Sequence, residues 1–129
     1  MTARADKPKV LVIDDDHAIA DTLAEILRRN DFTPIALYSG EEAIEFAERF
    51  QPDIVLSDIR MSRIDGIEAA KRIREVHPAC RVILFTASSV SQSMKQTIRD
   101  LKFEFLARPL HPEVVLTALR RESAPQNAN

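Results

Sequence analysis

The sequence predicts a doubly wound (βα)5 fold, an α/β three-layer sandwich in which helices cover both faces of a five-stranded parallel sheet. Five short apolar runs alternate with segments whose apolar residues recur at helical spacing. The connections between them are short, and this alternation is typical of parallel sheets with right-handed crossovers. The chain has 129 residues, of which 45% are hydrophobic and 29% are charged, and this is enough for one buried core.

The first half of the chain predicts two strand–helix units. The strands are the aliphatic and β-branched runs Val10–Ile13 and Thr33–Leu37. Asn30-Asp31 ends the helix between them, and the second helix begins after Ser39-Gly40 and ends before Pro52. Apolar residues recur every three or four positions in both helices: Ile19, Leu23, Ile26 and Leu27, then Ala43, Ile44, Ala47 and Phe50.

The second half predicts three more strands, each followed by a helix. The strands are Ile54–Leu56, Val82–Phe85 and Phe103–Leu106. Gly66 precedes the third helix, His77-Pro78 ends it, and Pro112 lies in the first turn of the fifth. The apolar helix positions are Ile67, Ala70, Ile73 and Val76, then Val90, Met94, Ile98 and Leu101, and finally Val115, Leu116 and Leu119.

Composition excludes several classes of protein. The net charge of −2 gives no support for direct nucleic-acid binding or for a membrane-surface role. No apolar run approaches the roughly 20 residues that span a bilayer, and Met1–Pro8 does not have the pattern of a signal peptide. Cys80 is the single cysteine, so no internal disulfide is possible and a reducing, cytoplasmic location is expected. Its apolar neighbours favour a structural position at the start of a strand.

Acidic residues follow two of the predicted strands. Asp14, Asp15 and Asp16 come directly after Val10–Ile13, and Asp58 closes the third apolar run. The first and third strands of a doubly wound sheet can be neighbours at the switch point, where ligands bind at the carboxyl ends. We therefore expect Asp58 to lie beside Asp14 and Asp15. Crowded carboxylates repel one another, and a divalent cation relieves the repulsion; oxygen ligands suit Mg²⁺ or Mn²⁺.

A hydroxyl and a cation follow two further strands. Thr86 comes after Val82–Phe85, and Arg108-Pro109 comes shortly after Phe103–Leu106. This combination suits phosphoryl transfer, because a carboxylate such as Asp58 can attack phosphorus and form an acyl phosphate. A divalent cation bridges the acids to the incoming group, while the hydroxyl and the cationic side chain bind its other oxygens.

These motifs resemble the receiver domain of two-component response regulators over about residues 8–121. The matching segments are Val10–Asp16, Ile54–Met61, Asp65-Gly66, Phe85–Ala87 and Phe105–Pro109. The resemblance implies a flavodoxin-like fold and a signal-transduction role. It also implies a single receiver domain over residues 1–129, with a polar tail over 122–129.

The resemblance assigns the central roles to the acidic residues. By it, Asp58 accepts a phosphoryl group from a histidine kinase or a phosphotransfer protein of a phosphorelay, and the chain is a phosphoacceptor rather than an enzyme. Asp14, Asp15, Asp58 and the backbone carbonyl of Arg60 would hold Mg²⁺, with Asp14 acting largely through water.

The resemblance also assigns roles around the acids. Thr86, Phe105 and Arg108 would bind the phosphoryl group or move with it. The Arg108–Pro109 peptide is expected to be cis, and Arg60 and Ser88 would tune the lifetime of the acyl phosphate. The fourth helix, fifth strand and fifth helix would form an output face for a homodimer or an effector, including Met94, Lys95, Ile98, Lys102, Glu104 and residues near Glu113.

Arg108 departs from the family, which has lysine at this position. The two residues are not interchangeable, since arginine is planar and favours bidentate partners. This supports an alternative hypothesis: a pseudo-receiver that acts as an interaction domain without regard to phosphorylation. Two loops also differ, because the family has glycine near the positions of Ser62-Arg63 and Leu101-Lys102. We expect the loss of glycine at Leu101-Lys102 to limit positive φ in the turn before the last strand.

A more remote hypothesis is a small phosphatase with an aspartate nucleophile, of the haloacid-dehalogenase type. Asp14 and Asp16 satisfy its Asp-x-Asp pattern after a first strand. Asp58 has no place in that scheme, and Asp16 is also the best candidate for the N-cap of the first helix.

Overall fold

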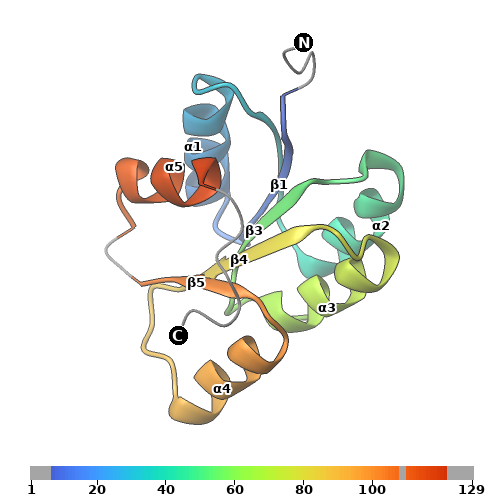
Figure 1. Ribbon diagram of the computed structural model, residues 1–129, viewed down its shortest axis with the longest axis vertical. Coiled ribbons are helices and arrows are strands. Elements are labelled where there is room, and N and C mark those ends of the chain that lie inside the picture. Colours follow the sequence, from blue (N-terminus) through green and yellow to red (C-terminus); the bar gives the residue numbers. More distant parts are fainter. Residues whose placement is uncertain (1–6, 108–109, 122–129) are drawn as a thin grey trace.

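The computed structural model describes residues 7–107 and 110–121, and strands alternate with helices as predicted (Figure 1). The five strands are β1 Lys9–Ile13, β2 Thr33–Leu37, β3 Ile54–Asp58, β4 Arg81–Phe85 and β5 Glu104–Leu106. They form one parallel sheet in the order β2-β1-β3-β4-β5. The doubly wound, flavodoxin-like (βα)5 prediction is confirmed, and β1 lies next to β3.

Five helices cover the two faces of this sheet. They are α1 His17–Arg28, α2 Gly40–Phe50, α3 Gly66–Val76, α4 Gln92–Asp100 and α5 Pro112–Arg120. Helices α1 and α5 lie on one face, and α2, α3 and α4 lie on the other (Figure 1). Alternate residues of β1 serve the two core layers, because successive strand side chains point to opposite faces. Val10 and Val12 pack toward α1 and α5, whereas Leu11 and Ile13 pack toward the other three helices.

Four helices begin at a side chain that caps them. Asp16, Ser39, Asp65 and Ser91 each accept a hydrogen bond from the backbone N–H three residues further on. Each cap satisfies a donor that the first turn leaves without a helical partner, which stabilises a helix by about 1 kcal/mol. The caps of α1 and α3 lie at the same edge of the sheet as the acidic residues, so they also fix where the loops beside those acids end.

The expectation that the turn at Leu101-Lys102 limits positive φ is wrong. Arg63 has φ 68° and Lys102 has φ 62°, and neither glycine of the chain has positive φ. The Lys102 turn is held by its own backbone, since Lys102 N–H donates to the Arg99 carbonyl and Phe103 N–H to the Ile98 carbonyl. These bonds offset the cost, about 1 kcal/mol, of placing a non-glycine residue in the left-handed region.

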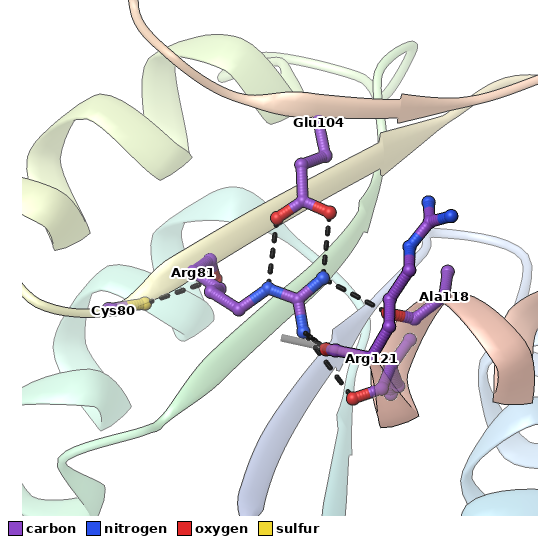
Figure 2. A network of polar contacts seen from close by, with 6 residues as sticks. Cys80, Arg81, Glu104, Ala118 and Arg121 are labelled. Carbon is purple, nitrogen blue, oxygen red and sulfur yellow. Dashed lines mark hydrogen bonds and ion pairs between the residues drawn. The ribbon is translucent and has the colours of Figure 1, made fainter. Parts of the chain in front are cut away.

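A half-buried arginine of β4 connects this strand to β5 and α5 (Figure 2). The Arg81 guanidinium binds both carboxylate oxygens of Glu104, with Nε–Oε2 at 2.9 Å and Nη2–Oε1 at 2.7 Å. Its remaining N–H groups donate to carbonyls at the end of α5, those of Ala118 at 3.0 Å, Arg121 at 2.9 Å and Leu119 at 3.4 Å. All five donors are therefore used, and the positive charge lies at the negative end of the α5 dipole.

The single cysteine has the structural position that was predicted. Cys80 is buried just before β4, and its thiol donates to the Arg81 carbonyl. Burial raises the pKa of the Cys80 thiol to about 11, which leaves it protonated and unreactive near neutral pH. Among the described helices, none has the length and apolar character needed to cross a membrane.

Candidate functional site

The strand order brings the predicted acids together. The ladder between β1 and β3 ends at the pair Ile13 and Ser57, so Asp14 and Asp58 follow at neighbouring positions on the two strands. Carboxylate oxygens of Asp14, Asp15 and Asp58 all lie within 4.8 Å of one another. Forty-three residues separate Asp15 from Asp58 along the chain, and the parallel register alone makes them neighbours. A group of three carboxylates can hold a metal ion.

Asp14 is the buried member of this group. Its side chain is only 2% exposed, and one carboxylate oxygen accepts the backbone N–H of Asp16 at 2.9 Å. Burial raises the pKa of Asp14; the N–H of Asp16 opposes the rise, and the negative charges of Asp15 and Asp16 add to it. A buried carboxylate with acidic neighbours is stabilised by any cation that reaches it.

Asp58 has the most perturbed acidity among the described carboxylates. Its pKa is raised to about 6, first by burial and second by the charge of Asp14, while the backbone N–H of Arg60 opposes the rise. Its Oδ1 is buried and has no hydrogen-bond partner among the described residues. A buried carboxylate oxygen without a donor is unfavourable, and a divalent cation at this point would satisfy it. The donor set therefore fits Mg²⁺.

The three adjacent aspartates have different partners. Asp15 is exposed, and its Oδ2 accepts the backbone N–H of Ser62 at 3.2 Å, which links it to the loop after β3. Asp16 instead caps α1 by accepting the N–H of Ile19 at 3.3 Å. The predicted cap is confirmed. The phosphatase hypothesis needed Asp16 beside the reacting group, and Asp16 is used in the helix cap while Asp58 completes the acidic group.

The switch candidates lie along the same edge of the sheet. Thr86, 5% exposed, follows β4, and its hydroxyl oxygen accepts the backbone N–H of Ser88 at 3.2 Å. Phe105 is half-buried on β5 and pairs in register with Leu84. Arg108 and Pro109 lie outside the described residues, so the cationic position and its cis peptide remain predictions.

Arg60 contacts a partner that the sequence did not suggest. Its guanidinium Nη2 donates to the carbonyl of Ser89 at 3.1 Å, and so joins the loop after β3 to the loop after β4. The sequence placed Arg60 and Ser88 near the pocket mouth by resemblance. It could not place the Ser89 carbonyl there, because a backbone acceptor is common to every residue and has no sequence signal.

An apolar cleft adjoins the acids, and the sequence did not predict it. The cleft has a volume of about 490 Å³, and Asp14, Asp58 and Thr86 are among the residues that line it. Its apolar wall comes from α1 and the start of α5: Ala18, Ile19, Leu23, Ile26, Leu110 and Pro112. Ile19 belongs to the apolar face predicted for the first helix, and it is 40% exposed. The sequence signal for this cleft was the apolar face of the first helix, which includes Ile19 in addition to residues buried in the core.

Only some residues of the predicted output face are exposed to solvent. Lys95, Lys102 and Glu113 are exposed and Met94 is half-buried. Ile98 is 3% exposed and packs in the core beneath α4, and the Glu104 carboxylate is bound by Arg81. The prediction was therefore wrong for Ile98 and Glu104, because the helix turns Ile98 inward and the neighbouring strand supplies an arginine.

Comparison with known proteins gives one consistent family. Residues 10–120 match the response regulator receiver domain. The transcriptional regulatory protein ZraR of Salmonella typhimurium is 31% identical over 104 residues, which cover 81% of this chain and 24% of that protein. The DNA-binding transcriptional regulator NtrC of Escherichia coli is 31% identical over 112 residues, covering 87% of this chain and 24% of that protein. The chain thus spans about a quarter of the length of these curated relatives.

Solved structures agree with the sequence matches. The chemotaxis protein CheY4 of Vibrio cholerae superposes with a TM-score of 0.81 at 25% identity, covering 89% of this chain and 98% of that one. The receiver domain of DrrB, in its BeF3-activated form, superposes with a TM-score of 0.77 at 26% identity, covering 89% and 96% of the two chains. The chain therefore belongs to the response regulator receiver domains, the phosphoacceptor domains of two-component signal transduction.

Proposed function

We propose that Asp58 accepts a phosphoryl group from a phosphorylated histidine of a kinase or phosphotransfer protein, with Mg²⁺ held by Asp14, Asp15, Asp58 and the Arg60 carbonyl. The observation that carries this is the Asp58 carboxylate itself, which is half-buried among acids with one oxygen lacking a partner among the described residues. The backbone N–H groups of Ile59 and Arg60 only partly offset the burial of this carboxylate, so an electrophile or a cation would stabilise it further.

The transfer needs few groups from the protein. A carboxylate oxygen of Asp58 attacks phosphorus, the new O–P bond forms as the N–P bond to the donor imidazole breaks, and the histidine leaves. When bound, Mg²⁺ offsets the negative charge of the acids and of the phosphoryl oxygens. The Thr86 hydroxyl is released from the Ser88 N–H to bind a phosphoryl oxygen, Arg108 supplies the second contact, and Phe105 moves with Thr86.

The cleft beside α1 suits the approach of the donor. Apolar residues of α1 and Asp58 line the same cleft. Ile19, in the first turn of α1, is one of the exposed large hydrophobic residues. A helix that bears the phosphohistidine buries its own apolar residues there and brings the imidazole to the acids. The outward surface of α4, of the turn before β5 and of α5, with Lys95, Lys102 and Glu113, remains the candidate face for a second copy or an effector.

The experiment is phosphorylation of the full chain by acetyl phosphate, followed by intact mass. We expect Mg²⁺-dependent labelling that is lost in Asp58→Asn and retained in Asp16→Asn, because Asp16 caps α1 and lies outside the group of three carboxylates that can hold a metal ion. Labelling that survives Asp58→Asn would show that the phosphoacceptor is another residue.

The pseudo-receiver is the second candidate, and arginine at position 108 is the observation that favours it. In this form the fold and acids persist, but phosphorylation does not change association. An Arg108→Lys variant distinguishes the two. If it gains a phosphorylation-dependent change in self-association or partner binding that the native chain lacks, the pseudo-receiver is supported; if both chains respond alike, it is not.

A further inference from the structure

Ser57 is a polar residue with no exposed surface, directly before Asp58. The ladder between β1 and β3 ends at Ser57, so Asp58 is the first residue of β3 beyond that ladder. The Ser57 hydroxyl donates to the carbonyl oxygen of Asp58 at 2.9 Å. This is a bond to the next peptide group of the same strand, and it restricts the orientation of that peptide at the point where the strand becomes a loop.

Gly66 packs closely against the same carbonyl. A Cβ on Gly66 would lie 2.0 Å from the Asp58 oxygen and 3.0 Å from the Ser57 hydroxyl, so the helix start packs directly on this peptide. Gly66 N–H also donates to the Ile59 carbonyl at 2.8 Å, and Ile59 N–H donates to the Phe85 carbonyl at 2.8 Å. The peptide after Asp58 is therefore restrained by β4, by α3 and by the Ser57 hydroxyl.

This peptide controls the geometry of the acid. The backbone N–H groups of Ile59 and Arg60 face the Asp58 carboxylate closely enough to favour its charged form. A rotation of the Asp58–Ile59 peptide would displace the Ile59 N–H directly. It would also shift the two peptide groups that follow, which contain the Arg60 N–H and the Arg60 carbonyl. The Ser57 hydroxyl thus acts on the acids through the backbone, although it touches none of their carboxylates in the described structure.

We propose that Ser57 is a positioning residue, whose hydroxyl holds the Asp58 peptide so that the Asp58 carboxylate and the Arg60 carbonyl are preorganised for Mg²⁺. The inference rests on the proposed function, because it concerns the same acidic group. If Ser57 only filled space in the core, its replacement would lower stability and leave the Mg²⁺ affinity unchanged.

The test compares Mg²⁺ affinity, by titration calorimetry, in the native chain and in three variants. Ser57→Ala removes one oxygen, and we expect its Mg²⁺ dissociation constant to rise about tenfold, the effect usual for groups that orient metal ligands. Ser57→Thr keeps the hydroxyl and should retain most of the affinity. Val82→Ala is the matched core control. Val82 is buried near the N-terminal end of β4, away from the acidic group, so the substitution should lower stability and change the Mg²⁺ affinity less than about twofold.

The outcomes separate this inference from the proposed function. If Ser57→Ala binds Mg²⁺ within about twofold of the native chain, the positioning role is wrong, whatever its effect on stability. An equal loss of affinity in Val82→Ala would likewise overturn it, because any core defect would then be sufficient. If the native chain neither binds Mg²⁺ nor is labelled at Asp58, the proposed function fails and this inference fails with it.

Discussion

Arg81 and Glu104 form a bidentate ion pair at the N-terminal edge of the sheet, and their side chains are only 13% and 14% exposed. The acidic group lies at the opposite edge, where the same strands end. The chain therefore has an ion-pair cluster around Arg81 (Figure 2) at one edge of the sheet and the acidic group at the other. Substitutions can address them separately.

Removal of one partner of the Arg81–Glu104 pair should be costly. Arg81→Met leaves the Glu104 carboxylate and the last carbonyls of α5 without their donor, and we expect the free energy of unfolding to fall by about 3 kcal/mol. Urea denaturation measures this. The double variant Arg81→Met with Glu104→Leu should recover part of the loss, because no unpaired charge remains. Labelling of Asp58 by acetyl phosphate should persist in both, and its loss would mean that the two edges are coupled.

The raised pKa of Asp58 predicts how stability changes with pH in metal-free buffer. The folded-state pKa of about 6 lies above the ordinary value of 3.8, so the folded chain binds the proton more tightly than the unfolded chain does. Below about pH 4 the Asp58 carboxyl is protonated in both states, so it does not lower the free energy of unfolding. Its cost grows as the pH rises toward 6 and then stays constant, at about 2–3 kcal/mol. Asp58→Asn should remove that cost and be more stable than the native chain at pH 7.5.

Denaturation of both chains between pH 4 and 8 checks this prediction. The stability of the native chain should fall across this range relative to Asp58→Asn, and the two curves should meet at the acidic end. Asp53→Asn is a suitable control. Asp53 is exposed, lies outside the acidic group, and accepts the backbone N–H of Lys9. A constant difference between the native and Asp58→Asn curves would contradict a raised pKa at Asp58.

Addition of Mg²⁺ should offset the destabilisation that the charged Asp58 carboxylate causes near neutral pH. A cation that binds only the folded acids stabilises the chain, by about 2.7 kcal/mol at a concentration one hundred times the dissociation constant. Thermal denaturation at pH 7.5 should therefore show a higher Tm with Mg²⁺ and a return to the starting value with EDTA. Asp15→Asn should show a much smaller rise. An equal rise in Asp15→Asn would place the cation elsewhere.

The two glycines should differ in their tolerance of a methyl group. At Gly66 a Cβ would lie 2.0 Å from the Asp58 carbonyl oxygen, whereas at Gly40 it would lie 2.9 Å from the Ile64 carbonyl oxygen. Gly66→Ala must displace either α3 or the Asp58 peptide, and we expect the larger destabilisation, about 3 kcal/mol, with slower labelling of Asp58. Gly40→Ala needs a smaller shift and should label normally. Equal behaviour of the two variants would show that the loop after β3 adapts freely.

Arg60 should influence how long the acyl phosphate persists. Its guanidinium spans the two loops beside Asp58 by binding the Ser89 carbonyl at 3.1 Å. Arg60→Ala removes this bridge and opens the approach of water, so we expect hydrolysis of phosphorylated Asp58 to become several-fold faster. Decay of the labelled protein after removal of acetyl phosphate measures the rate. Arg72→Ala, on the exposed face of α3, is the control and should decay like the native chain.

Much of the site was predictable because local pattern and parallel topology act together. The aliphatic run of β1 ends at Ile13, the run of β3 reaches Asp58, and adjacent parallel strands present their carboxyl ends at one edge. Two strands with acidic ends are then enough to predict the acidic group. The Asp16 cap was predictable for a similar reason, since capping depends on residues three positions apart.

What the sequence alone determined is therefore the α/β fold, the pairing of Asp14 and Asp15 with Asp58, and the family, all of which depend on short-range patterns repeated along the chain. The tertiary structure alone decided the Ser57 bond to the Asp58 carbonyl, the capture of Glu104 and the α5 carbonyls by Arg81, and the left-handed turn at Lys102. Apart from the Arg81–Glu104 ion pair, which joins two side chains 23 positions apart, each of these depends on main-chain groups. Every residue carries the same main-chain groups, so only the folded arrangement of the backbone selects which of them a side chain meets.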